Sequence, residues 1–301
     1  MNSCEICGST SFRKTTAKER MFGMGGSFEY LECENCKGLF LLDIPLDMGE
    51  YYPSNYYSLV NFNTSKGLRK WSKRIRYLLF KLGISLSPPV YFEWLQTLQG
   101  NENSKIADIG CGNGQLLEEL SYNGFKNLHG YDPFLLEDKY SERIQLKKMD
   151  YYDINEKYDI VMFHHAFEHI SNPVRVFEKL VTILNPGGKA LIRVPVTDGQ
   201  VWKESREFWF QLDAPRHLFI PNTKSLQILA TKFDLDLYSI KFDSFECQFW
   251  GTELYKRGKI LNGLNITEEF SQQELNNFKR KSIEYNKMKI GDQACFYFKL
   301  K

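Results

Sequence analysis

The chain has 301 residues, of which 43% are hydrophobic and 25% charged, as in an ordinary soluble globular protein with a large core. Its formal net charge of +2 is too small to indicate a nucleic-acid or membrane partner by itself. No run approaches the roughly 18 apolar residues of a membrane helix, and the first residues lack the build of a secretion signal. We therefore expect a cytoplasmic protein whose thiols are reduced.

Four of the seven cysteines form two C-x-x-C pairs in residues 1–45. Two such pairs on facing hairpins give the tetrahedral four-sulfur site of a zinc ribbon. Because a closed site leaves no open coordination position, we expect a structural Zn²⁺; iron in a rubredoxin-like site is the alternative. Two disulfides, or four idle thiols, conflict with a cytoplasmic protein. The predicted ligands are Cys4, Cys7, Cys33 and Cys36.

A tyrosine-rich connector follows, in which Tyr56 and Tyr57 are candidates either to close over a ligand or to pack within the linker. Residues 66–82 then show helical apolar periodicity together with seven Lys or Arg, and no acid occurs between Glu50 and Glu93. One interpretation is a helix packed on the core with a solvated charged face. The others are attraction to an anionic membrane, or to a pyrophosphate-bearing or nucleic-acid substrate. The apolar stripe comprises Leu68, Trp71, Ile75, Leu78, Leu79 and Leu82.

From about residue 104, strand and helix signals alternate, which predicts an α/β domain built on a parallel sheet. The expected strands are 106–109, 128–131, 144–149, 160–163 and 190–194. The expected helices are 114–122, 173–184 and 223–232, followed by a polar helix at about 267–288 and a last strand at 294–300.

The stretch DIGCGNG, residues 108–114, follows the first of these strands and opens a helix. Three glycines at every second position weaken either kind of element, so they indicate a turn whose backbone N–H groups face a ligand. The loop reads G-x-G-x-G, whereas a nicotinamide cofactor would favour G-x-G-x-x-G. Asp108, two residues ahead of the first glycine, is poorly placed for a pyrophosphate and well placed for an ammonium group.

Two further acids end the next two strands. Asp132 can accept both hydroxyls of a ribose, and Asp150 ends the strand after it. Three strand-end carboxylates around a glycine turn suit a ligand that carries an amine, a ribose and an adenine but no phosphate.

The segments IADIGCGNG, GYDP, YDIVMFHHAFEHI and LNPGGKALIRVP resemble the successive motifs of class I S-adenosylmethionine-dependent methyltransferases, over about residues 104–240. The resemblance implies a Rossmann-like, mostly parallel, seven-stranded sheet whose last strand inserts antiparallel. It also implies that Asp108 and the glycines hold the methionine end, Asp132 the ribose, and Asp150 with Tyr151 the adenine, while His164 faces the sulfonium. The implied cofactor residues are Asp108, Gly110, Gly112, Gly114, Asp132, Asp150, Tyr151 and His164.

The order of the three parts carries a second resemblance. A cysteine ribbon (1–45), a connector with the basic helix (46–95) and a methyltransferase core (96–301) are together similar to a bacterial group associated with sugar and polysaccharide biosynthesis. The segment LDAPRHLFIPNTKSL fits the same group. This kinship implies a sugar or nucleotide-sugar acceptor.

Methyl transfer from a sulfonium is an in-line displacement, so the protein mainly positions the acceptor and removes its proton. We expect His217 to be the base and Arg216 to grip a carboxylate or phosphate, with a loop salt bridge as the alternative. His165 is the second candidate base, whereas His169 with Glu168 fastens the turn. The chain lacks the Asn/Asp-Pro-Pro-Tyr/Phe run of N-methyltransferases after its fourth strand, which favours an O- or C-methyl acceptor.

Two other functions compete with this interpretation. An RNA methyltransferase would use the ribbon and the basic helix as an RNA clamp, and the near-neutral charge speaks against it. A non-catalytic protein that only binds the cofactor is disfavoured by the intact acids and glycines.

Overall fold

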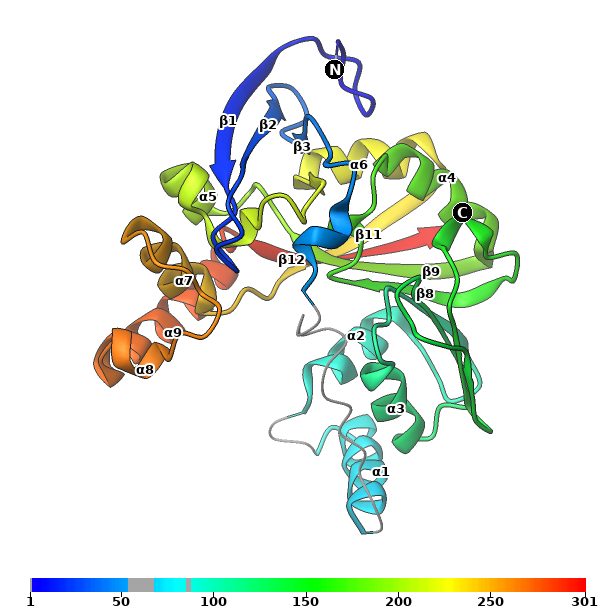
Figure 1. Cartoon of the computed structure of the whole chain (residues 1–301). Coiled ribbons are helices and arrows are strands. Elements are labelled where there is room, and N and C mark those ends of the chain that lie inside the picture. The colour runs from blue at the N-terminus through cyan, green and yellow to red at the C-terminus, as the bar shows by residue number, and fades with distance from the viewer. Residues whose placement is uncertain (1, 54–67, 85–87) are drawn as a thin grey trace.

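The computed structural model describes residues 2–53, 68–84 and 88–301. In this part of the chain the central sheet has eight strands, in the order β11-β12-β9-β8-β4-β5-β7-β6 (Figure 1). The predicted α/β fold is confirmed, and the eighth strand is the two-residue β6. The strands are β4 (Lys105–Ile109), β5 (Asn127–Tyr131), β6 (Lys139–Tyr140), β7 (Ile144–Lys147), β8 (Tyr158–His164), β9 (Leu184–Pro195), β11 (Leu235–Phe242) and β12 (Gln293–Leu300).

The five strands β7, β5, β4, β8 and β9 run parallel, and β12 lies antiparallel between β9 and β11, as expected for the last strand. In register, Ile106 of β4 lies opposite Leu128 of β5 and Ile160 of β8. The carboxyl ends of these strands therefore meet at one edge of the sheet. That edge is where ligands bind in open parallel sheets.

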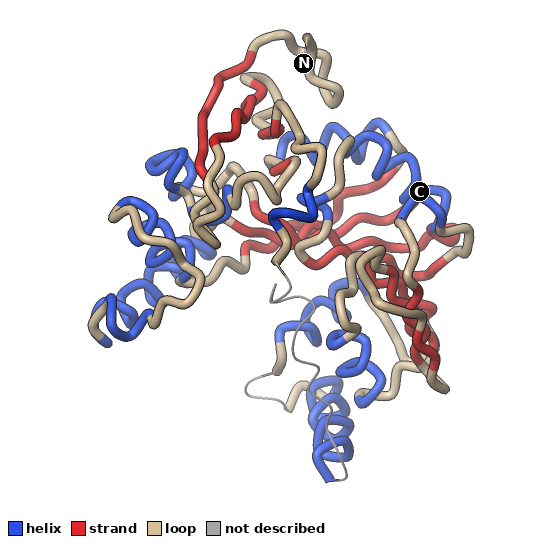
Figure 2. Tube along the Cα trace, in the orientation of Figure 1, coloured by secondary structure: helices blue, strands red, loops and turns tan. Residues whose placement is uncertain are grey.

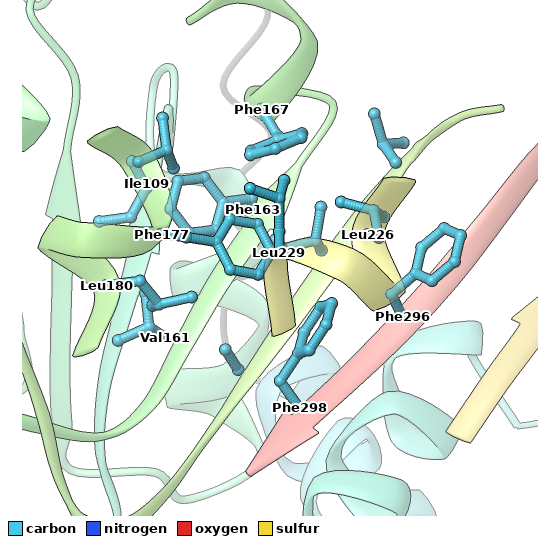
Figure 3. Close-up of a cluster of buried hydrophobic side chains, with 14 of the residues drawn as sticks. Ile109, Val161, Phe163, Phe167, Phe177, Leu180, Leu226, Leu229, Phe296 and Phe298 are labelled. Atoms are coloured by element: carbon cyan, nitrogen blue, oxygen red, sulfur yellow. The ribbon is translucent and has the colours of Figure 1, made fainter. Parts of the chain in front are cut away.

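Two helical layers cover the sheet, because successive strand residues point to opposite faces. On one face, α4 (Pro173–Ile183) and α6 (Thr223–Lys232) pack against Val161, Phe163 and the aromatic residues of β12 (Figure 3). On the other face, α2 (Val90–Leu98) and α3 (Gln115–Tyr122) cover Ile160 and Met162. The three predicted helices of this region are confirmed.

The polar helix expected at 267–288 is divided in two. The first part, α8 (Ile266–Glu269), ends at the C-cap Phe270. Ser271 then caps α9 (Gln272–Lys287), because its hydroxyl and the Glu274 side chain exchange hydrogen bonds with each other's backbone N–H. Residues 200–256 also contain α5 (Gln200–Ser205) and α7 (Cys247–Lys256), which the pattern did not reveal.

The amino-terminal ribbon is part of the main body. Its strands β1 (Phe12–Lys18), β2 (Ser27–Cys33) and β3 (Leu39–Leu41) are joined by β10 (Phe219–Ile220), which comes from the core region. Figure 2 shows these ribbon strands above the central sheet. The expected boundary at residue 45 is therefore crossed by the pairing of β3 with β10, and a shared apolar cluster joins Tyr30 to Trp202 and Trp209.

Helix α1 (Leu68–Lys81) does not pack on the body through its apolar stripe, which faces solvent instead. Trp71 is 73% exposed and Leu82 72%, whereas Tyr77 is only 3% exposed. Some of the cations face the body, where Lys73 pairs with Glu119 at 2.6 Å, whereas Lys70 and Arg76 are exposed. The Leu68 side chain and residues 66–67 lie outside the described residues, as do Tyr56 and Tyr57.

The inversion of α1 has an electrostatic and an aromatic cause. Glu102 and Glu119 on the body attract Lys81 and Lys73, and Tyr77 inserts beside Phe92 with ring centroids 4.9 Å apart. Sequence periodicity identifies the two faces of a helix but not which of them the body attracts. None of the helices in the described ranges has the length and apolar character needed to cross a bilayer.

Stability measurements test the orientation of α1. Because Tyr77 is buried, Tyr77→Ala should lower the free energy of unfolding in urea by about 3 kcal/mol. Trp71→Ala should change it by less than about 0.5 kcal/mol, since the Trp71 indole is exposed. A larger loss for Trp71→Ala than for Tyr77→Ala would mean that the helix packs through its apolar stripe.

Candidate functional site

The glycine turn lies at the carboxyl end of β4 and leads into α3. Gly110, Gly112 and Gly114 have φ angles of +68°, +52° and +84°, a region that side-chain-bearing residues rarely adopt. A Cβ at Gly110 would lie 2.5 Å from the Cβ of Ala166, in the turn after β8. The glycines therefore let the loop after β4 touch the loop after β8.

Asp132, at the carboxyl end of β5, is fixed beside this turn. Its Oδ2 accepts a hydrogen bond from the Gly112 N–H at 2.9 Å, and its Oδ1 accepts one from the Phe134 N–H at 2.8 Å. Each carboxylate oxygen keeps a second lone pair. The position of Asp132 and its free lone pairs both suit the ribose hydroxyls that the sequence predicts it to bind.

Asp108 is a buried carboxyl without a complete set of partners. It is 3% exposed, and its Oδ1 has no hydrogen bond. Burial first, and then the charge of Asp132, raise the pKa of Asp108 to about 8. A buried carboxyl beside a second anion favours a cationic ligand, and an ammonium group would satisfy the unpaired oxygen.

The residues predicted to hold the adenine are placed differently from each other. Asp150 is exposed, and its Oδ1 accepts from the Tyr152 N–H at 2.9 Å, which caps a short 3-10 helix (Tyr151–Asp153). The Tyr151 side chain points into the core, where its hydroxyl donates to the Val176 carbonyl at 2.9 Å. Because the Tyr151 ring is held in the core, its backbone is the part of this residue left to contact an adenine.

His164, the last residue of β8, stacks on Trp94 with ring centroids 4.3 Å apart. Both of its ring nitrogens are buried and have no hydrogen-bond partner. Burial first, and then the charge of Arg193, lower the pKa of His164 well below its usual value. The His164 ring is therefore neutral.

The turn after β8 carries a fully buried carboxylate among three histidines. Glu168 lies in the 3-10 helix Phe167–His169 and is bonded to His165 Nδ1 at 3.1 Å. His217 Nε2 lies 4.0 Å from the same carboxylate, and the His169 and His217 rings are 4.8 Å apart. Burial alone would raise the pKa of Glu168, but the bond from His165 and the neighbouring histidines lower it to about 2.

His217 and Arg216, the expected base and anion grip, are both buried in this cluster. His217 Nδ1 is bonded to the Gln211 carbonyl at 2.8 Å, and burial, then repulsion by His169, lower its pKa to about 4. Arg216 has no exposed surface and binds Asp213, Glu19 and the Tyr51 carbonyl. Arg216 therefore forms a salt bridge within the loop, which was the alternative role. It has no accessible donor with which to bind an acceptor.

The His165 side chain is 32% exposed, whereas that of His217 is 8% exposed. The Nδ1 of His165 is held by Glu168, which directs Nε2 away from the buried carboxylate. Sequence reasoning treated Glu168 as a fastener of the turn and did not identify Glu19 or Asp213. The Glu-His pair in FEHI was the available signal for Glu168, whereas Glu19 lies almost two hundred positions away from its partner Arg216 in the chain.

Two hollows of the described structure lie away from this edge of the sheet. One, of about 370 Å³, is lined by Ser104, Asp159 and Gly188 at the amino-terminal edge of the parallel strands. The other, of about 320 Å³, lies between the ribbon and residues 197–206. Neither includes a predicted cofactor residue, and the first is at the wrong edge of the sheet for a ligand of this fold.

The four ribbon cysteines form a compact cluster. The sulfurs of Cys4 and Cys36 are 3.6 Å apart, those of Cys7 and Cys33 are 3.5 Å apart, and all four lie within 4.8 Å of one another. A tetrahedral ion with Zn–S bonds of about 2.3 Å places its sulfurs about 3.8 Å apart. The residues present therefore fit a Zn²⁺ ion, and all of the thiols are free.

Comparison with known proteins identifies the family. Residues 85–240 match the model of a methyltransferase domain, and the chain belongs to this family. The tRNA U34 carboxymethyltransferase of Campylobacter hominis is 31% identical over 121 residues, which are 36% of this chain and 42% of that protein. The ubiquinone biosynthesis O-methyltransferase of Hydrogenovibrio crunogenus is 32% identical over 114 residues, 33% and 46% of the two chains.

Each of these alignments spans less than half of the relative's length. A solved cyclopropane synthase of Mycobacterium tuberculosis is 14% identical, with a TM-score of 0.43 over 68% of this chain and 81% of that one. Family membership supports S-adenosylmethionine as the methyl donor. The resemblance to sugar and polysaccharide methyltransferases finds no support in these relatives, whose names refer to tRNA and ubiquinone biosynthesis.

The raised pKa of Asp108 predicts a pH dependence of cofactor binding. The ammonium group requires the ionised carboxylate, so below pH of about 8 binding must release a proton and affinity should fall by up to tenfold per pH unit. Above about pH 8 the amino group of the cofactor itself loses its proton, so affinity should be greatest near that pH.

Titration calorimetry in buffers of different ionisation enthalpy measures both the affinity and the released proton. Asp108→Asn should bind more weakly and lose the proton release between pH 6 and 8. Equal proton release by the variant and the parent protein would show that another group carries the effect.

Proposed function

We propose that this protein transfers a methyl group from S-adenosylmethionine to an oxygen or carbon atom of its acceptor. The observation that carries the proposal is the unpaired, buried Asp108 carboxyl beside a glycine turn that is bonded to Asp132. The Asp108 carboxyl suits a cation, Asp132 suits a ribose, and the glycine turn lets the ligand approach the backbone closely. When bound, the cofactor supplies an electrophilic methyl group on a leaving sulfur.

The chain's own residues bind and orient the cofactor in this proposal. Asp108 and the N–H groups of the glycine turn hold the methionine end, and Asp132 accepts the ribose hydroxyls. Asp150 and the backbone of Tyr151 lie at the end of the neighbouring strand, where the adenine extends. Zn²⁺ at the four cysteines has a structural role, since four sulfurs close its coordination shell.

His165 is the base in the proposed reaction. The acceptor atom forms a bond to the methyl carbon, the carbon–sulfur bond breaks with its electron pair left on sulfur, and the acceptor proton passes to His165 Nε2. Glu168 orients the imidazole and stabilises the charge it gains. His165 replaces His217 in this role because it is far more exposed.

The acceptor defines two candidate functions. The order of ribbon, connector and core supports a sugar or nucleotide sugar as the acceptor. RNA is the second candidate, because several relatives are named tRNA U34 carboxymethyltransferases. Nucleotide sugars and unmodified tRNA incubated separately with methyl-labelled cofactor decide between them by mass spectrometry. We expect label in a nucleotide sugar; label in tRNA supports the second function, and no turnover with any acceptor supports a binding protein.

His165→Gln should lower kcat by about 10² to 10⁴-fold with the acceptor that becomes labelled, because it removes the base. The dissociation constant of the cofactor should stay unchanged, since the substitution leaves Asp108 and Asp132 in place. Stopped-flow measurement of single-turnover rates separates these two quantities. Full turnover by His165→Gln would exclude it as the base.

The outward stripe of α1 supports a second partner, an anionic membrane surface. Apolar side chains including Trp71 and Leu82 face solvent, on a helix that carries no acid. An apolar face flanked by Lys and Arg is the arrangement of helices that lie in a lipid interface.

Vesicle flotation tests this contact. Leu82→Ser should weaken binding to phosphatidylserine vesicles about tenfold, because one buried leucine contributes roughly 1.5 kcal/mol. The control Leu136→Ser, at another exposed leucine that lies after β5, should leave vesicle binding unchanged. Absence of flotation, or equal losses in both variants, would contradict a membrane role for α1.

A further inference from the structure

Glu168, His169 and His217 each offer one potential ligand atom, and these atoms all lie within 4.8 Å of one another. We propose that they bind a divalent transition-metal ion, in a site distinct from the four-cysteine cluster. Two imidazoles and one carboxylate form a ligand set that suits Mn²⁺, Fe²⁺, Co²⁺ or Zn²⁺ and leaves further coordination positions open.

The hydrogen bonds of the two histidines fix their ligand atoms. His169 Nδ1 lies 2.9 Å from the Arg216 carbonyl, and His217 Nδ1 lies 2.8 Å from the Gln211 carbonyl. A carbonyl only accepts, so each Nδ1 must carry the hydrogen and each Nε2 must carry a lone pair. Metal-binding histidines are oriented in this way, by donating the other ring N–H to a carbonyl.

The charge around the cluster also favours a cation. Glu168 is fully buried, its Oε2 has no hydrogen-bond partner, and its described ion pairs are with histidines alone. The neighbouring carboxylates of Asp213 and Glu19 share a single cation, Arg216. Three buried carboxylates against one guanidinium leave an excess of two negative charges when the histidines are neutral, and a divalent ion would balance it.

The dimensions suit an ion after a contraction. Neighbouring ligands of a tetrahedral or octahedral ion with bonds of about 2.1 Å lie about 3.0 to 3.4 Å apart. His217 Nε2 and Glu168 Oε1 are 4.0 Å apart, and the largest separation within the triad is 4.8 Å. Binding an ion would therefore draw the most distant ligand atoms together by about 1.4 to 1.8 Å, through movements of the three side chains.

The place of the site gives the ion a role, and this step rests on the proposed function. Ala166, two residues before Glu168, touches the glycine turn, so the ion would lie beside the reacting end of the cofactor. Glu168 bonds His165 through Oε1 and leaves Oε2 for the ion. An ion bonded to Oε2 would hold the Glu168 carboxylate, and through it the His165 imidazole, in one orientation.

Cobalt binding tests the site without any acceptor. Metal-stripped full-length protein titrated with Co²⁺ should bind two equivalents, one with the strong thiolate-to-cobalt absorption of the cysteine cluster and one without it. Glu168→Gln and His217→Asn should each lose the second equivalent alone. The control His129→Asn, which removes a buried histidine of β5, should retain both.

The wild-type stoichiometry decides the matter even if a variant does not fold. Binding of only the thiolate-bound equivalent, or retention of both equivalents by Glu168→Gln, would overturn the proposal. So would methyl transfer at full rate by protein that holds only the thiolate-bound ion. A second equivalent that binds in a protein unable to methylate any acceptor would support the metal site and contradict the proposed function instead.

Discussion

The site depends on the contact of backbones at the carboxyl ends of β4, β5 and β8. Gly112 donates to the Asp132 carboxylate at 2.9 Å, and Gly110 leaves the space that Ala166 fills. Side chains at these glycines would separate the loops and remove the cradle. Burial first, and then the nearby charge of Asp132, raise the pKa of Asp108. The fold therefore holds an unpaired carboxyl that a cationic ligand would satisfy.

The ribbon stabilises the opposite wall of the site. The Tyr30 hydroxyl donates to the His217 carbonyl at 2.9 Å, and Leu41 N–H donates to the Leu218 carbonyl at the same distance. Leu218 N–H in turn donates to the Glu168 carbonyl at 2.8 Å. A chain of hydrogen bonds thus runs from the cysteine ribbon through the 213–218 loop to the turn after β8. An ion at the ribbon would therefore act on the site only by holding this loop in place.

The alternation of strands and helices, and the edge at which the strand-end acids lie, were predictable because each depends on local pattern. Apolar runs, the glycine turn and the acids Asp108 and Asp132 lie within short stretches of sequence, and parallel topology then brings the strand ends together. Other features depend on contacts between distant segments. The burial of Arg216 requires Glu19, and the pairing of β3 with β10 joins residues 39–41 to 219–220. The orientation of α1 was set by Glu102 and Glu119, which periodicity within the helix does not register.

The most direct test of the account is a crystal structure of the protein with S-adenosylhomocysteine. We predict that the ribose hydroxyls bond to Asp132, that the amino group lies against Asp108, and that the adenine lies beside Asp150. A ligand bound elsewhere, or these carboxylates still bonded only to protein at saturating ligand, would contradict the central claim that the strand ends form an adenosyl-methionine site.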